Sequence, residues 1–378
     1  MTGPGLYLHI PFRRSKCSYF AFNSVAAQRD TVDAYLDLLA RQIEEYAALE
    51  WCGGRRFSTL FIGGGTPSLA SPAKLAAIIT LCRSRFSLAD QAEISMEANP
   101  DTIGPELLTT LREAGLNRLS IGIQSFNNAI LAGINRVHTA EQAIKAFHLA
   151  RGCGLANINI DLIYGLPHQT MADWQEDLQQ ILALAPEHLA LYELTIEPES
   201  PFGRLQAEKA LVLPDEDLLA DMEEATNTLL SPHYQRYEIA NFCRPGRQCR
   251  HNINYWLNGS YLGLGAGAVS CLDGLRFTHE SDPYRFMSAV EHKTTTIRQA
   301  ECLSRTARFR ESMIMGLRLI DGFNLRKLEK RLDISATEVY GPLLAELNSQ
   351  GRLLRQGEMI RLAPDWLPVA NQVLNTLV

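Results

Sequence analysis

The sequence predicts an α/β protein with a parallel sheet, followed by a smaller helical module. Three observations predict this fold. Short apolar or β-branched runs alternate with amphipathic stretches in the first half of the chain, a proline-containing stretch at residues 197–214 interrupts them, and helical patterns dominate after Ser304. Repeated strand–helix alternation is typical of parallel sheets with helical crossovers. The six strands expected here could form an open doubly wound sheet or a partial barrel.

The expected elements of the sheet region follow from their hydrophobic periodicity. An amphipathic helix is expected at 32–49, where apolar residues recur every three or four positions. After the proline-containing stretch we expect a helix at 215–230 and another strand at 234–242. The six principal strands are expected at Leu6–Ile10, Thr59–Ile62, Glu93–Glu97, Arg118–Ile123, Ile158–Ile163 and Leu189–Ile196.

The C-terminal region predicts a winged-helix-like module. Helices are expected at 305–320, 325–332 and 336–349, and a hairpin at 351–362 turns at Gln356-Gly357. Between Arg305 and Asp365, 11 Lys and Arg residues stand against 8 Asp and Glu residues. That excess is too small to indicate DNA binding, so a packing or lid role is favoured.

Composition excludes several classes of protein. The 378 residues are 46% hydrophobic and 21% charged, which is typical of a globular protein with a large core. The net charge of −6 argues against a nucleic-acid partner. No apolar run is long enough to span a bilayer, and the N-terminus has no signal-peptide pattern. Eight scattered cysteines without a Cys-x2-Cys pair favour reduced thiols, and hence a cytoplasmic location.

Polar and glycine-rich motifs follow the expected strands, where α/β folds carry their ligand sites. In residues 63–67, consecutive glycines can bring the backbone close to a ligand and expose N–H groups, although a tight turn explains them equally well. Glu97, Gln124 and Asp161 end three strands, and Arg136 lies beyond the fourth. Together they could hold hydroxyls, a ribose or an amino group.

The combined motifs resemble a known family. Residues 61–68, 93–100, 118–126 and 159–167 resemble the oxygen-independent coproporphyrinogen III oxidases of the radical S-adenosylmethionine (SAM) superfamily. The His251–Trp256 segment matches the His-Asn-x-x-Tyr-Trp motif of the haem-chaperone branch, HemW, and the longer N-terminal extension of the oxidase is lacking. The resemblance implies a partial (β/α)6 TIM-like barrel at 1–235, a barrel-closing extension at 236–300 and the winged-helix-like module at 301–378.

The resemblance also implies a set of ligand sites and partners. His251 would be the haem ligand, with Cys249 as an alternative, and the haem would pass to an unidentified acceptor protein. The residues alone favour a structural role for His251, as for most single histidines. The SAM site would comprise Tyr7 and Tyr19 as flanking rings, Gly64, Gly65 and Thr66 at the amino and carboxylate end, and Glu97, Gln124, Arg136 and Asp161 along the rest.

The chain departs from the family at its iron–sulfur loop. Intact members hold a [4Fe–4S] cluster with Cys-x3-Cys-x2-Cys, but here Arg13 and Phe20 flank Cys17. A guanidinium only donates hydrogen bonds and a phenyl ring has no lone pair, so neither can bind iron. Rescue by Cys243 and Cys249 is conceivable, but their spacing does not recommend it.

This departure leaves three functional hypotheses. The first is a haem chaperone with remnants of a SAM site and a defective cluster site, in which Arg13 and Phe20 fill the space of the cluster. The second is an active radical SAM enzyme of the coproporphyrinogen III dehydrogenase type. The third is a catalytically silent scaffold. Arg13 and Phe20 argue against the second, so radical SAM catalysis is not expected.

Overall fold

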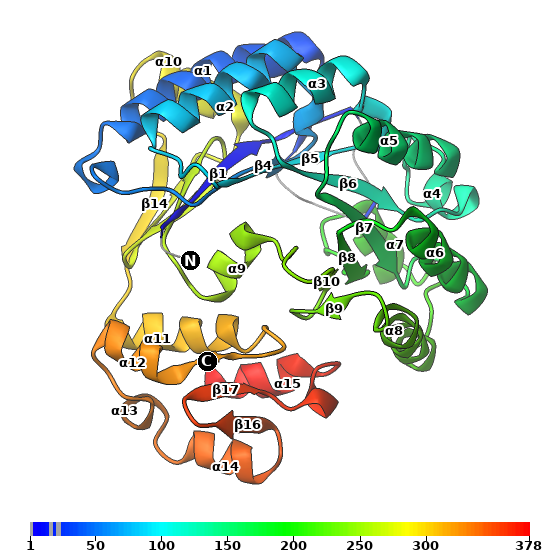
Figure 1. Ribbon diagram of the computed structural model, residues 1–378, viewed down its shortest axis with the longest axis vertical. Helices are drawn as coiled ribbons and strands as arrows, with labels where there is room; N and C mark the ends of the chain where they lie inside the picture. The colour runs from blue at the N-terminus through cyan, green and yellow to red at the C-terminus, as the bar shows by residue number, and fades with distance from the viewer. Residues whose placement is uncertain (1–2, 15–17, 20–23) are drawn as a thin grey trace.

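The structure, a computed structural model, describes residues 3–14, 18–19 and 24–378, so Cys17 and Phe20 lie outside the described residues. Its main feature is a curved sheet in the order β14-β13-β12-β11-β1-β4-β5-β6-β7-β8-β10-β9 (Figure 1). The strands are β1 (Gly5–Ile10), β4 (Thr59–Gly64), β5 (Glu93–Ala98), β6 (Arg118–Gln124), β7 (Ile158–Tyr164), β8 (His188–Glu193), β9 (Gln235–Arg236), β10 (Asn241–Cys243), β11 (Tyr261–Leu264), β12 (Val269–Leu272), β13 (Leu275–His279) and β14 (Ile297–Cys302).

The order of the strands confirms the partial barrel. β1 and β4 to β8 pair in parallel and in chain order, without the reversal of a doubly wound sheet. β11 adds a parallel strand beside β1, and antiparallel strands extend both edges. A short parallel pair, β2 (Phe12–Arg13) and β3 (Val25–Ala26), lies outside this sheet.

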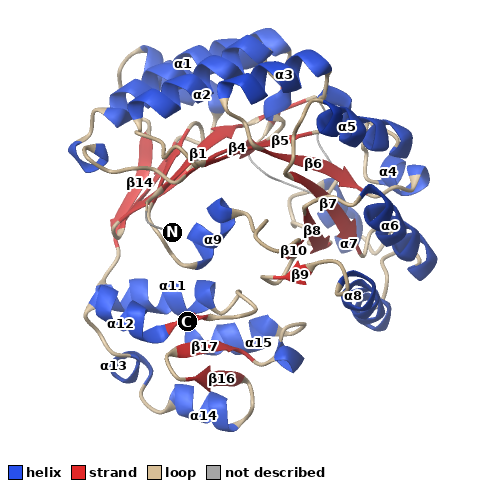
Figure 2. Cartoon of the chain, in the orientation of Figure 1, coloured by secondary structure: helices blue, strands red, loops and turns tan. Residues whose placement is uncertain are grey.

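Helices cover the convex face of the sheet, whereas α9 lies inside its hollow (Figure 2). Alternating Leu and Ile side chains of the strands pack outward against these helices into one buried core. The helices of the sheet region are α1 (Arg29–Ala47), α2 (Pro72–Arg85), α3 (Pro105–Ala114), α4 (Asn128–Gly133), α5 (Ala140–Gly152), α6 (Met171–Leu184), α7 (Pro201–Ala207), α8 (Glu216–Leu230), α9 (Arg250–Trp256) and α10 (Pro283–Glu291).

The C-terminal module has a buried core of its own, from Phe309 to Leu377. A three-stranded sheet in the order β15-β17-β16 packs with its helices. The division of the chain at 1–235, 236–300 and 301–378 stays a prediction. The elements are α11 (Arg305–Gly316), β15 (Phe323–Asn324), α12 (Leu325–Leu332), α13 (Ala336–Tyr340), α14 (Leu343–Ser349), β16 (Leu353–Gln356), β17 (Met359–Leu362) and α15 (Ala370–Leu374).

Three elements depart most from the sequence predictions, and the helices expected at 32–49 and 305–320 have shifted bounds, Arg29–Ala47 and Arg305–Gly316. The single strand expected at 234–242 is two short antiparallel strands, β9 and β10, joined by a turn. The strand expected to reach Ile196 ends at Glu193. The helix expected at 336–349 is broken into α13 and α14, because Gly341 adopts a φ of +55° and Pro342 has no N–H to continue the helix. Within the described ranges, no helix has the length and apolarity that crossing a membrane requires.

Candidate functional site

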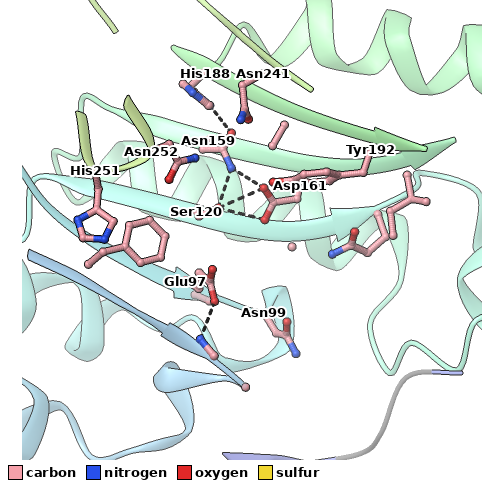
Figure 3. A pocket seen from close by; sticks show the side chains of 18 of the residues that line it. Glu97, Asn99, Ser120, Asn159, Asp161, His188, Tyr192, Asn241, His251 and Asn252 are labelled. Carbon is pink, nitrogen blue, oxygen red and sulfur yellow. Dashed lines mark hydrogen bonds between the residues drawn. The ribbon is translucent and has the colours of Figure 1, made fainter. Parts of the chain in front are cut away.

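The concave face of the sheet surrounds a cavity of about 630 Å³ (Figure 3). Its volume falls within the usual range of small-molecule sites, about 300–1,000 Å³. Side chains alternate between the two faces of a strand, so the outward Leu and Ile residues leave polar residues facing inward. In β6, for example, Arg118, Ser120 and Gly122 line the cavity, whereas Leu119 and Ile121 belong to the core.

Most of the residues proposed from the sequence meet in this cavity. Thr66 instead lines a smaller neighbouring pocket, where Asn99 donates a hydrogen bond to its hydroxyl at 3.3 Å. Cys17 falls outside the described residues, so its position is not assigned. The proposed residues that line the cavity are Tyr7, Tyr19, Gly64, Gly65, Glu97, Gln124, Arg136, Asp161 and His251.

The glycine loop is a tight turn whose N–H groups are already used. The Gly64 N–H donates to Glu97 at 3.0 Å, and those of Gly65 and Thr66 donate to the carbonyls of Ile10 and Phe12 at 2.8 and 2.7 Å. A Cβ added to Gly65 would lie 2.3 Å from the Phe12 oxygen, so only glycine fits there. The expectation that this loop exposes free N–H groups to a ligand is therefore wrong for these three residues.

Gln124 and Arg136 are positioned by the backbone and by polar neighbours. Gln124 has a φ of +76°, and the pairing of β6 with β7 shifts register between Gly122 and Gln124. Such strain is uncommon for a residue with a side chain and clusters at functional sites. Arg136 donates to Tyr19 Oη at 3.1 Å and to Asn99 Oδ1 at 3.2 Å, which holds Tyr19 at the cavity wall.

Arg13 and Glu97 meet at the glycine loop. The Arg13 guanidinium donates to the Gly64 carbonyl at 3.3 Å and lines the cavity. Burial and the nearby Asp161 carboxyl raise the pKa of Glu97 to about 7, while the Gly64 N–H and the charge of Arg13 oppose that rise. Because the pKa of Glu97 is about 7, its carboxyl group is partly protonated at neutral pH, and the charge of Arg13 favours the ionised form.

The raised pKa of Glu97 predicts a pH-dependent loss of stability. Its pKa in the folded state, about 7, exceeds the ordinary value of 4.5, so the folded protein holds this proton more tightly than the unfolded chain. The stabilisation is complete below pH 4.5 and is lost as pH rises through 7. Relative to Glu97→Gln, the wild-type protein should lose about 2 kcal/mol between pH 5 and pH 8 in urea unfolding. Identical pH profiles for the two proteins would contradict the assignment.

A buried polar network, which the sequence predictions missed except for Asp161, crosses the inner face of the sheet (Figure 3). Asn159 donates to both Ser120 Oγ and Asp161 Oδ1 at 2.6 Å, and His188 Nδ1 lies 2.6 Å from Asn159 Oδ1. Tyr237 Oη lies 2.9 Å from His188 Nε2. Alternation of polar and apolar residues along β6, β7 and β8 is the signal that could have found them.

His251 lies in the cavity wall near the N-terminal ends of β1 and β4. The side chain is buried, and its Nδ1 lies 2.7 Å from Thr59 Oγ1 while its Nε2 lies 3.0 Å from Tyr255 Oη. The ring stacks on Phe61 with centroids 5.2 Å apart. Burial, assisted by the charge of Arg118, lowers the pKa of His251 to about 3, so the imidazole is neutral at pH 7.

Helix α9 carries His251 and is fixed at both ends. At its start the Glu93 carboxylate accepts from the backbone N–H groups of Arg250 and His251, both at 3.1 Å. At its end Arg331, from α12, donates to the Leu257 carbonyl at 3.2 Å. The C-terminal module therefore contacts the helix that closes one end of the cavity.

The described residues do not fit a [4Fe–4S] cluster. Arg13 holds a ligand position with a group that cannot bind iron. Over residues 3–14, 18–19 and 24–378, no three His, Cys, Asp or Glu side chains are grouped so that they could hold a metal ion. Cys243 and Cys249, which could have rescued the site, form no such group either, and burial raises the pKa of both thiols.

Comparisons with known proteins agree on one family. Residues 11–181 match the Radical SAM superfamily, and residues 303–365 match the HemN C-terminal domain. The solved structure of coproporphyrinogen III oxidase (HemN) from Escherichia coli, a radical SAM enzyme, superimposes with a TM-score of 0.86 and 26% identity, covering 99% of this chain and 90% of that one.

Curated relatives place the chain more narrowly. The haem chaperone HemW of Lactococcus lactis is 35% identical over 97% of this chain and 95% of its own length. The haem chaperone HemW of Escherichia coli is 42% identical over 75% of each chain. Identity at this level over nearly full length, together with the shared fold, shows that the chain belongs to the HemW family of haem chaperones.

Proposed function

We propose that this protein binds haem in the cavity and transfers it to an acceptor protein, without radical chemistry that depends on a cluster. The observation that carries the proposal is a neutral, buried imidazole in the wall of a cavity large enough for a small-molecule ligand, in a chain of the HemW family. The acceptor is a further protein of unassigned identity, and the proposed place of transfer is the cytoplasm.

His251 is the proposed haem ligand because its surroundings suit one. Iron binds a neutral imidazole nitrogen, and its other nitrogen is commonly held by a hydrogen-bonding partner. If Nδ1–H donates to Thr59, the Tyr255 hydroxyl donates to the Nε2 lone pair. Haem iron would then take the place of the Tyr255 hydroxyl, while Thr59 keeps the ring oriented. Cys249 is a weaker candidate, since burial raises the pKa of its thiol to about 12 and disfavours the thiolate.

The SAM-site residues are proposed to retain ligand binding at the other end of the cavity. Ionised Glu97 suits an ammonium group, and the carboxyl of Asp161 suits ribose hydroxyls. When bound to a cluster, SAM supplies a radical on reductive cleavage. Here the chain's own residues would only bind and orient SAM, because the described residues do not fit the cluster.

Haem titration tests the proposal. We expect a Soret band that saturates near one equivalent of haem, because a single site is proposed. His251→Ala should weaken binding at least about tenfold through loss of the axial bond, whereas His233→Ala, which removes an exposed histidine, should bind as the wild type does. A wild-type protein with no saturable binding would leave the scaffold hypothesis, and an unaffected His251→Ala variant would remove His251 from the site.

The same titration includes Tyr255→Phe as a probe of the ligand atom. The phenol oxygen lies 3.0 Å from Nε2 and must leave before iron can bind there. Removing that hydrogen bond should therefore tighten haem binding about fivefold, the equivalent of about 1 kcal/mol. Weaker binding would show that the hydroxyl supports the haem site instead of competing with iron.

A further inference from the structure

Arg118 is a buried guanidinium that lines the cavity and has no hydrogen-bonded partner among the described residues. It is the first residue of β6, its side chain is only 2% exposed, and it lines the cavity. Its Nε is buried with no hydrogen-bond partner. In the described part of the chain, neighbouring charges act on its side chain, but no ion pair or hydrogen bond joins it to them.

The carboxylates near Arg118 are committed to other groups. Glu93 accepts the two N–H groups that begin α9. Asp161 accepts from Ser120 at 3.0 Å and from Asn159 at 2.6 Å. Both influence Arg118 through their charge, but neither pairs with it directly. A buried charge without a hydrogen-bonded partner is costly, so the donors of Arg118 are available for a ligand.

We propose that Arg118 binds a carboxylate of the porphyrin at the end of the cavity closed by α9. This inference rests on the proposed haem-binding function and names the second point of attachment. The planar guanidinium matches a carboxylate in a two-point hydrogen bond, and haem carries propionate carboxylates at the edge of its ring. Tyr7, Phe61 and Tyr255 line the same cavity and offer aromatic surface to the macrocycle.

The location of Arg118 distinguishes it from the other arginines of the cavity. Arg13 and Arg136 lie where the strands end, and they donate to Gly64 and to Tyr19 and Asn99. Arg118 begins its strand, and its charge acts on Cys249 and Tyr237 beside α9. A porphyrin carboxylate drawn to this end would place the macrocycle between Arg118 and His251.

Metal-free mesoporphyrin and its dimethyl ester test this inference by fluorescence titration. Neither contains iron, so the proposed bond between His251 and iron does not contribute to their binding. The wild-type protein should bind the diacid at least about tenfold more tightly than the diester, because a charge-assisted hydrogen bond is lost on esterification. Arg118→Gln should weaken the diacid at least about tenfold and leave the diester within about threefold. Arg118→Lys should recover part of the affinity for the diacid.

Controls separate this inference from general damage and from the proposed function. Arg56→Gln removes an exposed arginine charge that pairs with exposed Asp90, and this variant should bind both porphyrins as the wild type does. Equal weakening of diacid and diester in Arg118→Gln, or equal binding of both by the wild type, overturns the inference. If haem binding depends on His251 but not on Arg118, the inference about Arg118 is overturned and the proposed function stands. If neither haem nor either porphyrin binds, both the inference and the proposed function are overturned.

Discussion

Replacing Arg13 and Phe20 together by cysteine is expected to raise the iron content after anaerobic reconstitution from below one to about four irons per chain. The double variant completes Cys-x3-Cys-x2-Cys around Cys17. The wild-type loop has only one thiolate, and no grouped ligands occur elsewhere in the described residues. Iron and sulfide analysis with a visible spectrum measures the change.

Matched variants show whether the loop itself binds the cluster. Arg13→Cys and Phe20→Cys alone provide two thiolates each and should retain little iron after desalting, and Cys17→Ala in the double variant should abolish the gain. A wild-type protein that carries about four irons per chain would overturn the proposal that this loop no longer binds a cluster. Failure of the double variant to gain iron would show that more than two ligands have changed at the site.

Arg13 has a second effect, on the electrostatics of the cavity. Its charge favours the ionised form of Glu97, whose pKa is already raised to about 7. Replacing it with a neutral side chain would raise the pKa of Glu97 further and favour the protonated carboxyl at neutral pH. The arginine thus keeps a negative charge available beside the glycine loop, where the proposed SAM ammonium would bind.

The fold was predictable because its signals are local and periodic. The apolar runs that begin at Leu6 and Thr59 became β1 and β4 with small shifts of boundary. The error at 234–242 arose because β-branched and aromatic composition does not reveal a turn between two very short strands. The error at 336–349 had a visible signal in Gly341-Pro342, which apolar spacing on both sides obscured.

Without the family resemblance, which also pointed to Tyr7, Tyr19 and His251, the site was predictable only where a strand ends in a motif. Glu97, Gln124 and Asp161 stood out because polar residues at strand ends suggest ligands. Arg118 and His188 lie at the starts of their strands, and they reach the cavity only because the sheet curves around it. The hydrogen bonds of the glycine loop depend on β2 lying against it, a contact that no local pattern reveals.

Glu93→Ala is expected to cost about 3–5 kcal/mol in the free energy of unfolding. The carboxylate is 6% exposed and accepts from the backbone N–H groups of Arg250 and His251, while the thiol of Cys249 lies 3.5 Å from it. Alanine would leave these donors buried without acceptors and would remove a negative charge that offsets Arg118. Urea unfolding measures the loss.

Two further variants separate the hydrogen bonds that Glu93 accepts at the start of α9 from the effect of its negative charge. Glu93→Gln keeps an acceptor oxygen and the shape of the side chain, so it should cost less stability than Glu93→Ala. As a control, Glu106→Ala, at an exposed position in the first turn of α3, should change stability by less than about 0.5 kcal/mol. A Glu93→Ala variant within about 1 kcal/mol of wild type would contradict the capping role. Because the same carboxylate fixes the backbone of His251, Glu93→Ala should also weaken haem binding under conditions in which the protein remains folded. Stability of the helix and affinity for haem would then fall together, from the loss of one buried side chain that does not itself line the cavity.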